Sequence, residues 1–406
     1  MDVRLMRSYN SCVWGRREGA PGLIAYNERS PLGIGWSMHM GIVRNPRGVT
    51  GQNPGDGLVP NNPVVEMPDG SVHSLYRIPG SNPIQYRSKE FWLFRPVSGA
   101  PGKWELLLTD GTIYTFEYNP PNVGYNTYGS PWVEIAQATS IKHASNTTIT
   151  MTYQYNTTNY YLYLTRITDT AGRSITFQYN TSLHQLTSIT TPWKNTTRTI
   201  SYSYIRVNSN NFLQTVTLPA DTSRPYWQYS YQTTSTSLPS YYELNKITFP
   251  AGGTISYDYQ NKYFTTAVVS GVPYRVLLGV VTSRTTGGSA AGGSRPIPAG
   301  TWTYDYNSGG TAGQPDVTTV TSPDNIREVY TINGWRNASI GNVWRVGMPA
   351  KKEIYQNNVL IYKEDLGFPW FCGHTEKQGD NTLGGVSWRK DEGNTRRNSR
   401  LKQFAW

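Results

Sequence analysis

Aromatic and polar residues alternate along several short stretches of the chain. In each stretch three aromatic or aliphatic residues stand two positions apart, with mostly Ser, Thr, Gln or Asp between them. Successive side chains of a β-strand point to opposite faces of its sheet, so this spacing predicts strands with one buried aromatic face and one wet polar face. The stretches are Tyr114–Tyr118, Met151–Tyr155, Ile175–Tyr179, Ile200–Tyr204, Trp227–Tyr231, Ile255–Tyr259 and Trp302–Tyr306.

A second pattern, Leu-x-x-(Ile/Val)-Thr, precedes the later aromatic stretches at steps of 22, 27, 31 and 34 residues. After each copy comes a segment rich in Pro, Gly, Asp or Asn, which reverses a strand. The repeating unit is therefore strand, turn, aromatic strand and variable loop. Its copies begin at Leu164, Leu186, Leu213, Leu244 and Leu278.

One such hairpin buries little apolar surface by itself, so its neighbours must cover it. Hairpins stacked edge to edge form a continuous sheet, in which adjacent tyrosines make cross-strand pairs. We predict an all-β fold of repeated antiparallel β-hairpins that form a curved or spiralling sheet. We expect the tyrosines that define the repeats to pack chiefly between strands: Tyr179, Tyr204, Tyr231, Tyr257, Tyr259, Tyr304 and Tyr306.

The sequence divides into three regions. Residues 1–135 hold less regular hairpins, residues 136–345 hold the repeats, and residues 346–406 hold a decaying last repeat and a basic tail that we expect to be poorly ordered. In the first region, Pro31-Leu-Gly-Ile-Gly-Trp36 sets two glycines beside an indole, which predicts close backbone packing. Strand-like sequence begins a few residues after Met1, so we expect the natural N-terminus and any export signal to lie upstream.

Composition supports a β-protein with a polar, uncharged surface. Aromatic residues make up 13% of the chain and charged residues only 16%, below the usual figure of roughly 25%. The net charge is +11, yet the basic residues are dispersed except between Lys377 and Lys402, and no recognition helix or zinc-finger spacing accompanies them. We therefore predict no nucleic-acid partner. No apolar run approaches the ~18 residues of a membrane helix, so we predict no membrane insertion.

Candidate chemistry is sparse. Cys12 and Cys372 stand at opposite ends of the chain without further metal ligands nearby. Asp69, Asp110 and Asp169 lie in turns, where a turn-capping role is expected in place of calcium binding. No Gly-x-Ser-x-Gly motif occurs, and no carboxylate pair stands out for glycoside hydrolysis, although a hydrolase is kept as a test case. We predict no catalytic residues, no metal and no cofactor.

Carbohydrate binding is the activity that the composition favours. Exposed aromatic rings pack on the C–H faces of sugars, while Asn, Asp and Arg bond to the hydroxyl groups. Because the repeat tyrosines are expected on the packed face, the candidate contacts are loop aromatics. They are Tyr125, Tyr128, Trp132, Trp193 and Tyr274.

Ile255-Ser-Tyr-Asp-Tyr259 and Trp302-Thr-Tyr-Asp-Tyr306 resemble the tyrosine-aspartate (YD) repeats of the bacterial Rhs family, which is related to teneurins and Tc toxin shells. Ser8-Tyr-Asn-Ser11 and Leu32-Gly-Ile-Gly-Trp36-Ser37 are similar to the segment that precedes such repeats, so the resemblance covers roughly residues 5–365. It implies a sheet wound into a hollow shell, often around a C-terminal toxin. The Asp-Pro core segment of self-cleaving members has no counterpart in these 406 residues.

These observations lead to two functional hypotheses. The first is a non-enzymatic structural shell segment of a secreted or cell-surface Rhs protein, of the polymorphic-toxin or contact-dependent competition type. On this hypothesis the chain is the N-terminal part of such a protein or a short member, and its partner is the remainder of a larger YD-repeat shell. The alternative is an adhesive module that binds a polysaccharide or cell-surface glycan.

Overall fold

The computed structural model describes residues 5–9, 14–17, 24–25, 30–46, 62–118, 135–157, 161–207, 210–219, 226–232, 243–269, 272–288, 299–307, 315–334 and 348–365. For 14–17, 24–25, 265–269, 272–274, 276 and 278 it describes the backbone alone. Within these ranges the secondary structure is β-strand and turn, and no helix that could cross a membrane is present.

The strands before the repeats are short. They are β1 (Ser8–Tyr9), β2 (Trp14–Arg17), β3 (Ile24–Ala25), β4 (Trp36–Ser37), β5 (Ile42–Arg44), β6 (Val64–Glu66), β7 (Val72–Ser74), β8 (Tyr76–Arg77), β9 (Tyr86–Arg87), β10 (Leu93–Pro96), β11 (Lys103–Leu107) and β12 (Ile113–Tyr118).

The later strands are longer and carry the repeats. They are β13 (Ile135–Lys142), β14 (Thr148–Asn156), β15 (Tyr161–Asp169), β16 (Ser174–Asn180), β17 (Gln185–Trp193), β18 (Thr196–Val207), β19 (Asn210–Thr217), β20 (Tyr226–Tyr231), β21 (Leu244–Thr248), β22 (Gly253–Val269), β23 (Val272–Gly288), β24 (Gly300–Asn307), β25 (Asp316–Thr321), β26 (Ile326–Ile332), β27 (Pro349–Gln356) and β28 (Val359–Asp365).

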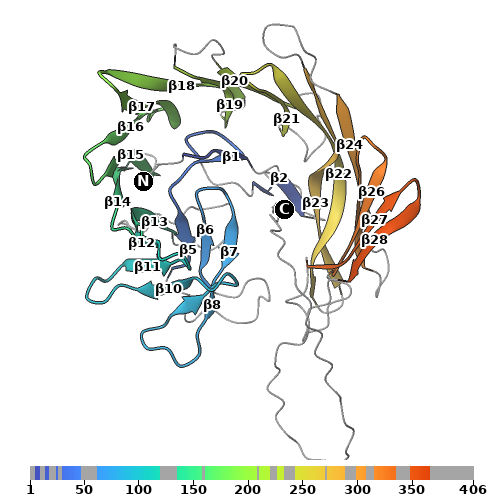
Figure 1. The fold of residues 1–406 in the computed structure, drawn as a ribbon, viewed down its shortest axis with the longest axis horizontal. Coiled ribbons are helices and arrows are strands. Elements are labelled where there is room, and N and C mark those ends of the chain that lie inside the picture. Colours follow the sequence, from blue (N-terminus) through green and yellow to red (C-terminus); the bar gives the residue numbers. More distant parts are fainter. Residues whose placement is uncertain are drawn as a thin grey trace, which may run out of the picture.

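From β8 to β28 each strand pairs antiparallel with the next along the chain, which gives one long sheet that follows a wide arc (Figure 1). Short strands branch from it, because β5 pairs with β13 and β2 pairs with β23. In the described ranges β8 pairs only with β9 and β28 only with β27, so the sheet is open. The predicted all-β curved sheet of antiparallel hairpins is confirmed.

A β-bulge recurs at the same position of the repeat. In the pair β14–β15, Thr152 faces Arg166 and Tyr153 faces Leu164, so Thr165 is an extra residue. The bulged residue is thus the second of the Leu-x-x-(Ile/Val)-Thr pattern, and its hydroxyl donates to the Thr152 carbonyl at 3.0 Å. Because bulges bend and twist a strand, this repeated shift curves the sheet. Equivalent shifts precede Tyr179, Tyr204 and Tyr231. The shift before Phe116 lies outside the leucine pattern, and the shift before Tyr259 leaves Thr282, the last residue of the Leu278 copy, as the extra residue.

Successive hairpins are joined by a tyrosine hydroxyl as well as by backbone pairing. The strands β15 and β16 pair only over Arg166–Thr168 and Ser174–Thr176 and then diverge. Across the gap the Tyr179 hydroxyl donates to the Leu164 carbonyl at 2.8 Å, in place of the missing backbone hydrogen bond. The same bond joins Tyr153 to Ala138, Tyr204 to Leu186, Tyr231 to Leu213 and Tyr259 to Leu244, at 2.6–2.8 Å.

The N-terminal segment lies inside the arc and packs on the repeats (Figure 1). The Leu186 N–H donates to the Pro31 carbonyl at 2.9 Å, and the Trp36 indole donates to the Tyr231 hydroxyl at 2.8 Å. At Gly33, with φ +93°, an added Cβ would lie 2.6 Å from the Asn211 carbonyl oxygen. The close packing predicted for this motif is confirmed.

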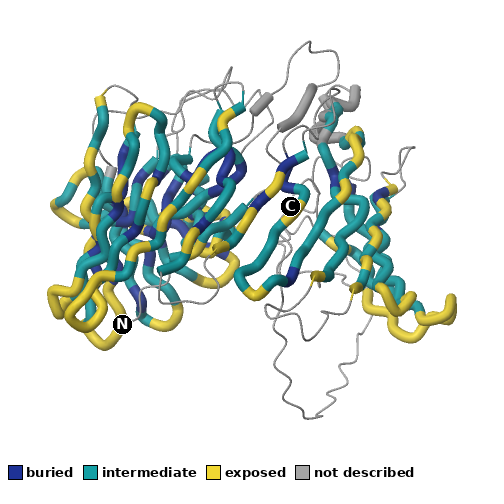
Figure 2. Tube along the Cα trace, turned by 90° about the horizontal axis from the view of Figure 1, so that it is seen from above, coloured by how far each residue is buried: buried dark blue, intermediate teal, exposed yellow. Residues whose placement is uncertain are grey.

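The core occupies the inner face of the arc. Figure 2 shows buried positions along the strands and exposed positions gathered at the turns. The turns themselves are closed by the aspartates predicted to cap them. Asp69 accepts the Ser71 N–H at 2.9 Å, Asp110 accepts that of Thr112 at 2.8 Å, and Asp169 accepts that of Ala171 at 3.0 Å.

Candidate functional site

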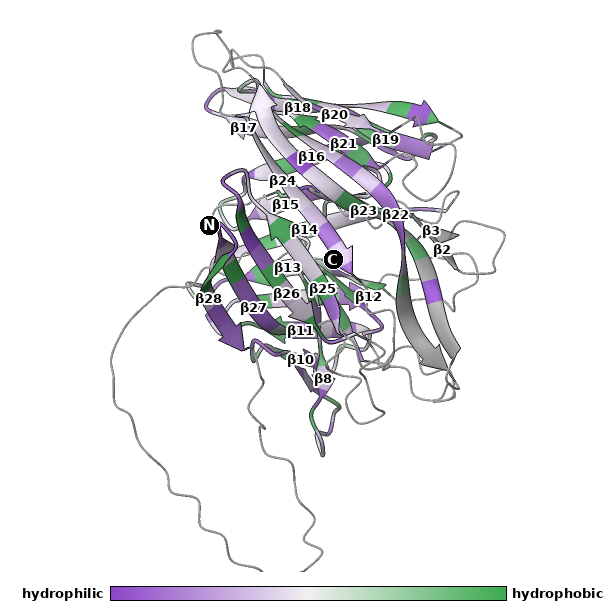
Figure 3. Ribbon diagram, turned by 90° about the vertical axis from the view of Figure 1, so that its right-hand side faces the viewer, coloured by the Kyte–Doolittle hydropathy of each residue, from purple (hydrophilic) through white to green (hydrophobic). Residues whose placement is uncertain are grey.

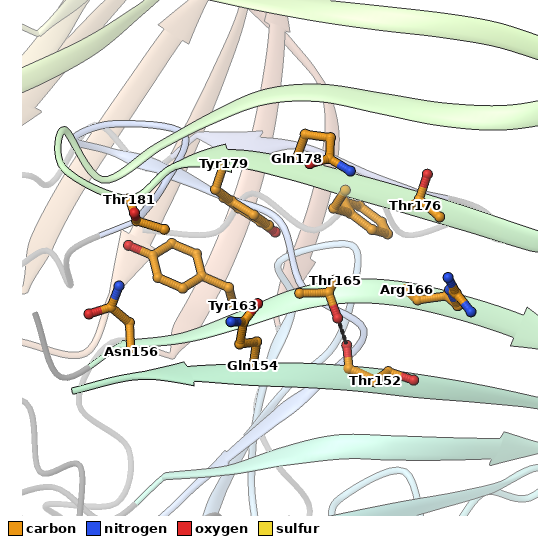
Figure 4. A pocket seen from close by; sticks show the side chains of 11 residues that line it. Thr152, Gln154, Asn156, Tyr163, Thr165, Arg166, Thr176, Gln178, Tyr179 and Thr181 are labelled. Atoms are coloured by element: carbon orange, nitrogen blue, oxygen red, sulfur yellow. Dashed lines mark hydrogen bonds between the residues drawn. The ribbon is translucent and has the colours of Figure 1, made fainter. Parts of the chain in front are cut away.

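A groove of about 460 Å³ opens where β15 and β16 diverge. The wet-face side chains of β14–β16 form its walls, and the rings of Tyr163 and Tyr179 lie between the strands (Figure 4). Phe177 also lines the groove. The polar lining residues are Thr152, Gln154, Asn156, Thr165, Arg166, Thr176, Gln178 and Thr181. The groove is a direct result of the repeat geometry, since the strands separate beyond their three paired residues.

Ring contacts hold the aromatic part of this groove rigid. Tyr163 lies 4.6 Å from Tyr179 and 4.9 Å from Tyr161 between ring centroids, and its hydroxyl lies 2.7 Å from His184 Nδ1. Burial raises the pKa of Tyr161 and of Tyr179, so both hydroxyls stay protonated at neutral pH. The Tyr179 ring is also fixed by its bond to the Leu164 carbonyl.

The groove is suited to a neutral, hydroxyl-rich ligand. Amide and hydroxyl side chains such as Gln154, Gln178 and Thr181 can both donate and accept hydrogen bonds. Arg166 is the only charged residue among the described lining residues. Tyr163 and Phe177 are buried, at 2% and 3% exposure, so the partly exposed Tyr179 is the ring available for a sugar to stack on. The uncharged side chains around it offer partners for the hydroxyl groups of the sugar.

None of the loop aromatics predicted to contact glycans is among the described lining residues of this groove. Tyr125, Tyr128 and Trp132 lie outside the described residues. Trp193 ends β17 with 46% of its surface exposed, and the Arg198 guanidinium lies 3.9 Å from its ring centroid. Tyr274 lies in strand β23, opposite Ala267, and not in a loop; its side chain is outside the described residues.

Sequence reasoning missed the groove residues although their signal was present. Gln154 and Gln178 occupy the polar positions of the alternating stretches, which predicted only a wet face. Of the repeat-defining tyrosines, Tyr179 alone lines the groove, while Tyr257 and Tyr259 line a cavity on the inner face. Tyr204 and Tyr231 form the hydroxyl bonds between hairpins, and Tyr304 and Tyr306 lie in β24.

One hydrogen-bond chain has the order of a serine hydrolase triad. Ser71 Oγ lies 2.9 Å from His73 Nε2, and His73 Nδ1 lies 3.1 Å from Glu90 Oε1. However, the Ser71 hydroxyl donates to Asp69 at 2.6 Å, and its backbone N–H bonds the same oxygen. The proton therefore points away from the histidine, and this N–H is not available to an oxyanion. The chain of bonds closes the hairpin turn.

Two further carboxylates, those of Glu66 and Glu117, are held in ion pairs. Burial raises the pKa of Glu66, but hydrogen bonds and charge from His39 and Arg44 outweigh it and bring the pKa to about 2. Glu117 pairs with Lys103 at 3.2 Å. Among the described residues no group of His, Cys, Asp or Glu could hold a metal ion.

Residues 164–192 match the family model of the RHS repeat, and they run from β15 into β17, across the groove. This segment of the chain carries an RHS repeat. The matched segment holds two Leu-x-x-(Ile/Val)-Thr copies and the aromatic strand between them. No curated protein sequence matches the RHS-repeat chain.

Solved structures with similarity to the RHS-repeat chain include a porin-like protein of Bacteroides uniformis, at 12% identity and a TM-score of 0.26, over 60% of this chain and 97% of the other. The N-terminal domain of the effector SpvB of Salmonella typhimurium matches at 12% identity and a TM-score of 0.22, over 70% and 88%. The Tc holotoxin pore of Photorhabdus luminescens matches at 11% and 0.27, over 92% of this chain and 20% of the toxin chain.

Proposed function

We propose that the chain is a non-enzymatic wall segment of a larger YD-repeat shell, secreted or displayed at the cell surface in a polymorphic-toxin or contact-dependent competition system. The repeated tyrosine-to-carbonyl bond carries this proposal. It joins each hairpin to its predecessor at five successive junctions, from Tyr153 to Tyr259. Because the same hydrogen bond recurs at each junction, a curved wall can be extended by adding hairpins. The bond places no reactive group at the junctions.

The edge strand β28 supports the same function. Val359 and Ile361 are 64% and 56% exposed, and among the described residues β28 pairs only with β27. Strand β28 begins hydrophobic and ends hydrophilic (Figure 3). An edge with free backbone groups and apolar side chains accepts a further strand readily. In the proposed shell, that strand belongs to the next hairpin of the wall.

Lysine cross-linking in the producing cells tests the wall proposal. Lys363 lies on β28, and Lys142 on β13 is an internal control far along the sheet. We expect Lys363 to cross-link to a polypeptide segment with further YD repeats, and Lys142 to cross-link within the chain. Cross-links of Lys363 confined to residues 1–406, with the protein monomeric in gel filtration, would contradict the proposal. Cell fractionation then tests export, because the proposed protein is expected at the surface or in the medium.

Glycan binding at the groove between β15 and β16 is a second candidate function. The uncharged amide and hydroxyl lining beside fixed tyrosine rings favours it. We expect saturable binding on a glycan array that falls about tenfold or more in Gln154→Ala and Gln178→Ala, since each loses one or two hydrogen bonds to the ligand. Gln137→Ala, on the wet face of β13, serves as the matched control. A flat array signal, or equal losses in all three variants, rejects this function.

A further inference from the structure

A second cavity, of about 450 Å³, lies on the inner face of the arc between the N-terminal segment and the repeats. Arg7, Tyr9 and Trp36 line it from the N-terminal segment, and Trp227, Tyr257 and Tyr259 line it from β20 and β22. The volume is in the range of small-molecule sites, roughly 300–1,000 Å³. A ligand here touches two parts of the chain that are about 190 residues or more apart.

The polar atoms of several lining aromatics are already engaged. The Tyr9 hydroxyl accepts the Leu244 N–H at 2.9 Å, and the Tyr259 hydroxyl donates to the Leu244 carbonyl at 2.7 Å. The Trp36 indole N–H donates to the Tyr231 hydroxyl at 2.8 Å. These side chains are therefore fixed in position, and what they contribute to the cavity is apolar ring surface.

Arg7 is the one charged residue among the lining residues of this cavity. Its guanidinium carbon lies 5.9 Å from the ring centroids of both Tyr202 and Trp227, and its side chain hydrogen-bonds to Tyr202. The cavity lining contains no carboxylate among the described residues. Glu243 interacts electrostatically with the lining residues Tyr9 and Tyr259, and burial raises its pKa to about 8, so this carboxyl is neutral at pH 7. A half-buried cation among aromatic rings gains most from an anionic partner.

We propose that this inner cavity binds a small ligand with a flat apolar body and a single carboxylate. The guanidinium offers a planar pair of N–H donors that matches a carboxylate, and the aromatic rings of Trp227 and Tyr257 offer surface for the ligand body. The charge and the apolar surface are both required. An apolar amide lacks the negative charge, and inorganic phosphate lacks the apolar surface. The proposal does not depend on the wall function.

Calorimetry on the full chain with a matched pair of probes tests this site. We expect naphthalene-2-carboxylate to bind saturably and about tenfold or more tighter than naphthalene-2-carboxamide, because only the carboxylate forms charge-assisted hydrogen bonds with Arg7. Phosphate at the same concentration is expected not to displace it. Equal binding of the two naphthalene probes, displacement by phosphate, or no saturable binding at millimolar concentration overturns the proposal.

A variant set locates the charge. Arg7→Gln is expected to weaken carboxylate binding about tenfold and to leave carboxamide binding unchanged, and Arg7→Lys to fall between the wild type and Arg7→Gln. Arg173→Gln, at an exposed turn where Arg173 pairs with Asp169, is the control and is expected to bind like the wild type. Unchanged carboxylate binding in Arg7→Gln refutes the assignment. Near-UV circular dichroism checks the fold of each variant, and the comparison of the two probes on the wild type needs no variant.

Discussion

Glu243 places an ionisable group where the fold cannot solvate its charge. The side chain is completely buried, and neither carboxylate oxygen has a hydrogen-bond partner among the described residues. It packs so closely on the backbone of Gly279 that a Cβ there would clash with the carboxyl group. Burial raises the pKa of Glu243 from its ordinary value of 4.5 to about 8. The protonated form is therefore the one that fits the folded protein.

The pKa of Glu243 is about 8 in the folded state and 4.5 in the unfolded state, and this difference makes stability depend on pH. Between pH 4.5 and 8 the folded state holds a proton that the unfolded state has released, so the free energy of unfolding falls as the pH rises through this window. Each pH unit between the two pKa values corresponds to about 1.4 kcal/mol, which gives a loss of at most about 5 kcal/mol above pH 8. Below pH 4.5 both states are protonated, and Glu243 adds no pH dependence.

Urea unfolding of Glu243→Gln at pH 5, 7 and 9 measures this loss. Gln has nearly the same shape and cannot ionise, so we expect the variant to gain several kcal/mol relative to the wild type between pH 5 and pH 9. Glu105→Gln removes a partly exposed carboxylate paired with Arg95 and is expected to change the pH profile by less than about 1 kcal/mol. Parallel stability profiles for Glu243→Gln and the wild type across this range would refute the reasoning.

Three further outcomes are expected. Tyr231→Phe removes the hydroxyl that joins Trp36 to Leu213 and should lower the free energy of urea unfolding by about 1–3 kcal/mol. Tyr226→Phe, at an exposed tyrosine, should lower it by less than about 0.5 kcal/mol. Equal losses in the two variants contradict the bridging role of Tyr231. Gly33→Ala should lower the free energy of unfolding by about 3 kcal/mol, because the new Cβ meets the Asn211 carbonyl. Gly80→Ala has a similar positive φ but open space, and should lower it by only about 1 kcal/mol; matching losses mean that the contact is unimportant. Glu66, with its pKa of about 2, should contribute stability above pH 4.5 that disappears as the pH falls towards 2. The free energy of unfolding of Glu66→Gln should therefore fall less between pH 4.5 and pH 2 than that of the wild type. An equal fall in the two proteins argues against this contribution of Glu66.

The repeat unit was predictable because its signals are local. Period-two aromatics and the turn residues after each Leu-x-x-(Ile/Val)-Thr copy fall within about fifteen residues of one another. The bond from Tyr179 to Leu164 was not visible in this way, because it depends on where β15 and β16 stop pairing. The contact between Tyr204 and Pro31 spans 173 residues, so only the assembled arc places the N-terminal segment.

The glycan-binding residues could not be predicted from local sequence signals either. Tyr274 was assigned to a variable loop between an aromatic stretch and the next leucine motif. The chain there forms β22 and β23, two strands of 17 residues each, because β-branched and aromatic residues continue as far as Val269 and resume at Val272. The groove between β15 and β16 could not be located from sequence either, because it requires two strands to separate after a fixed number of pairs.

The curvature of the wall depends on how many of its hairpins carry the bulge. In four successive hairpins the extra residue falls on the leucine strand directly after the leucine, so each bend has the same direction and adds to the last. The pair β24–β25 carries no such shift, so this increment is missing there. Evolution can therefore change the circumference of such a wall by duplicating or deleting one hairpin, and can straighten it locally by deleting one residue.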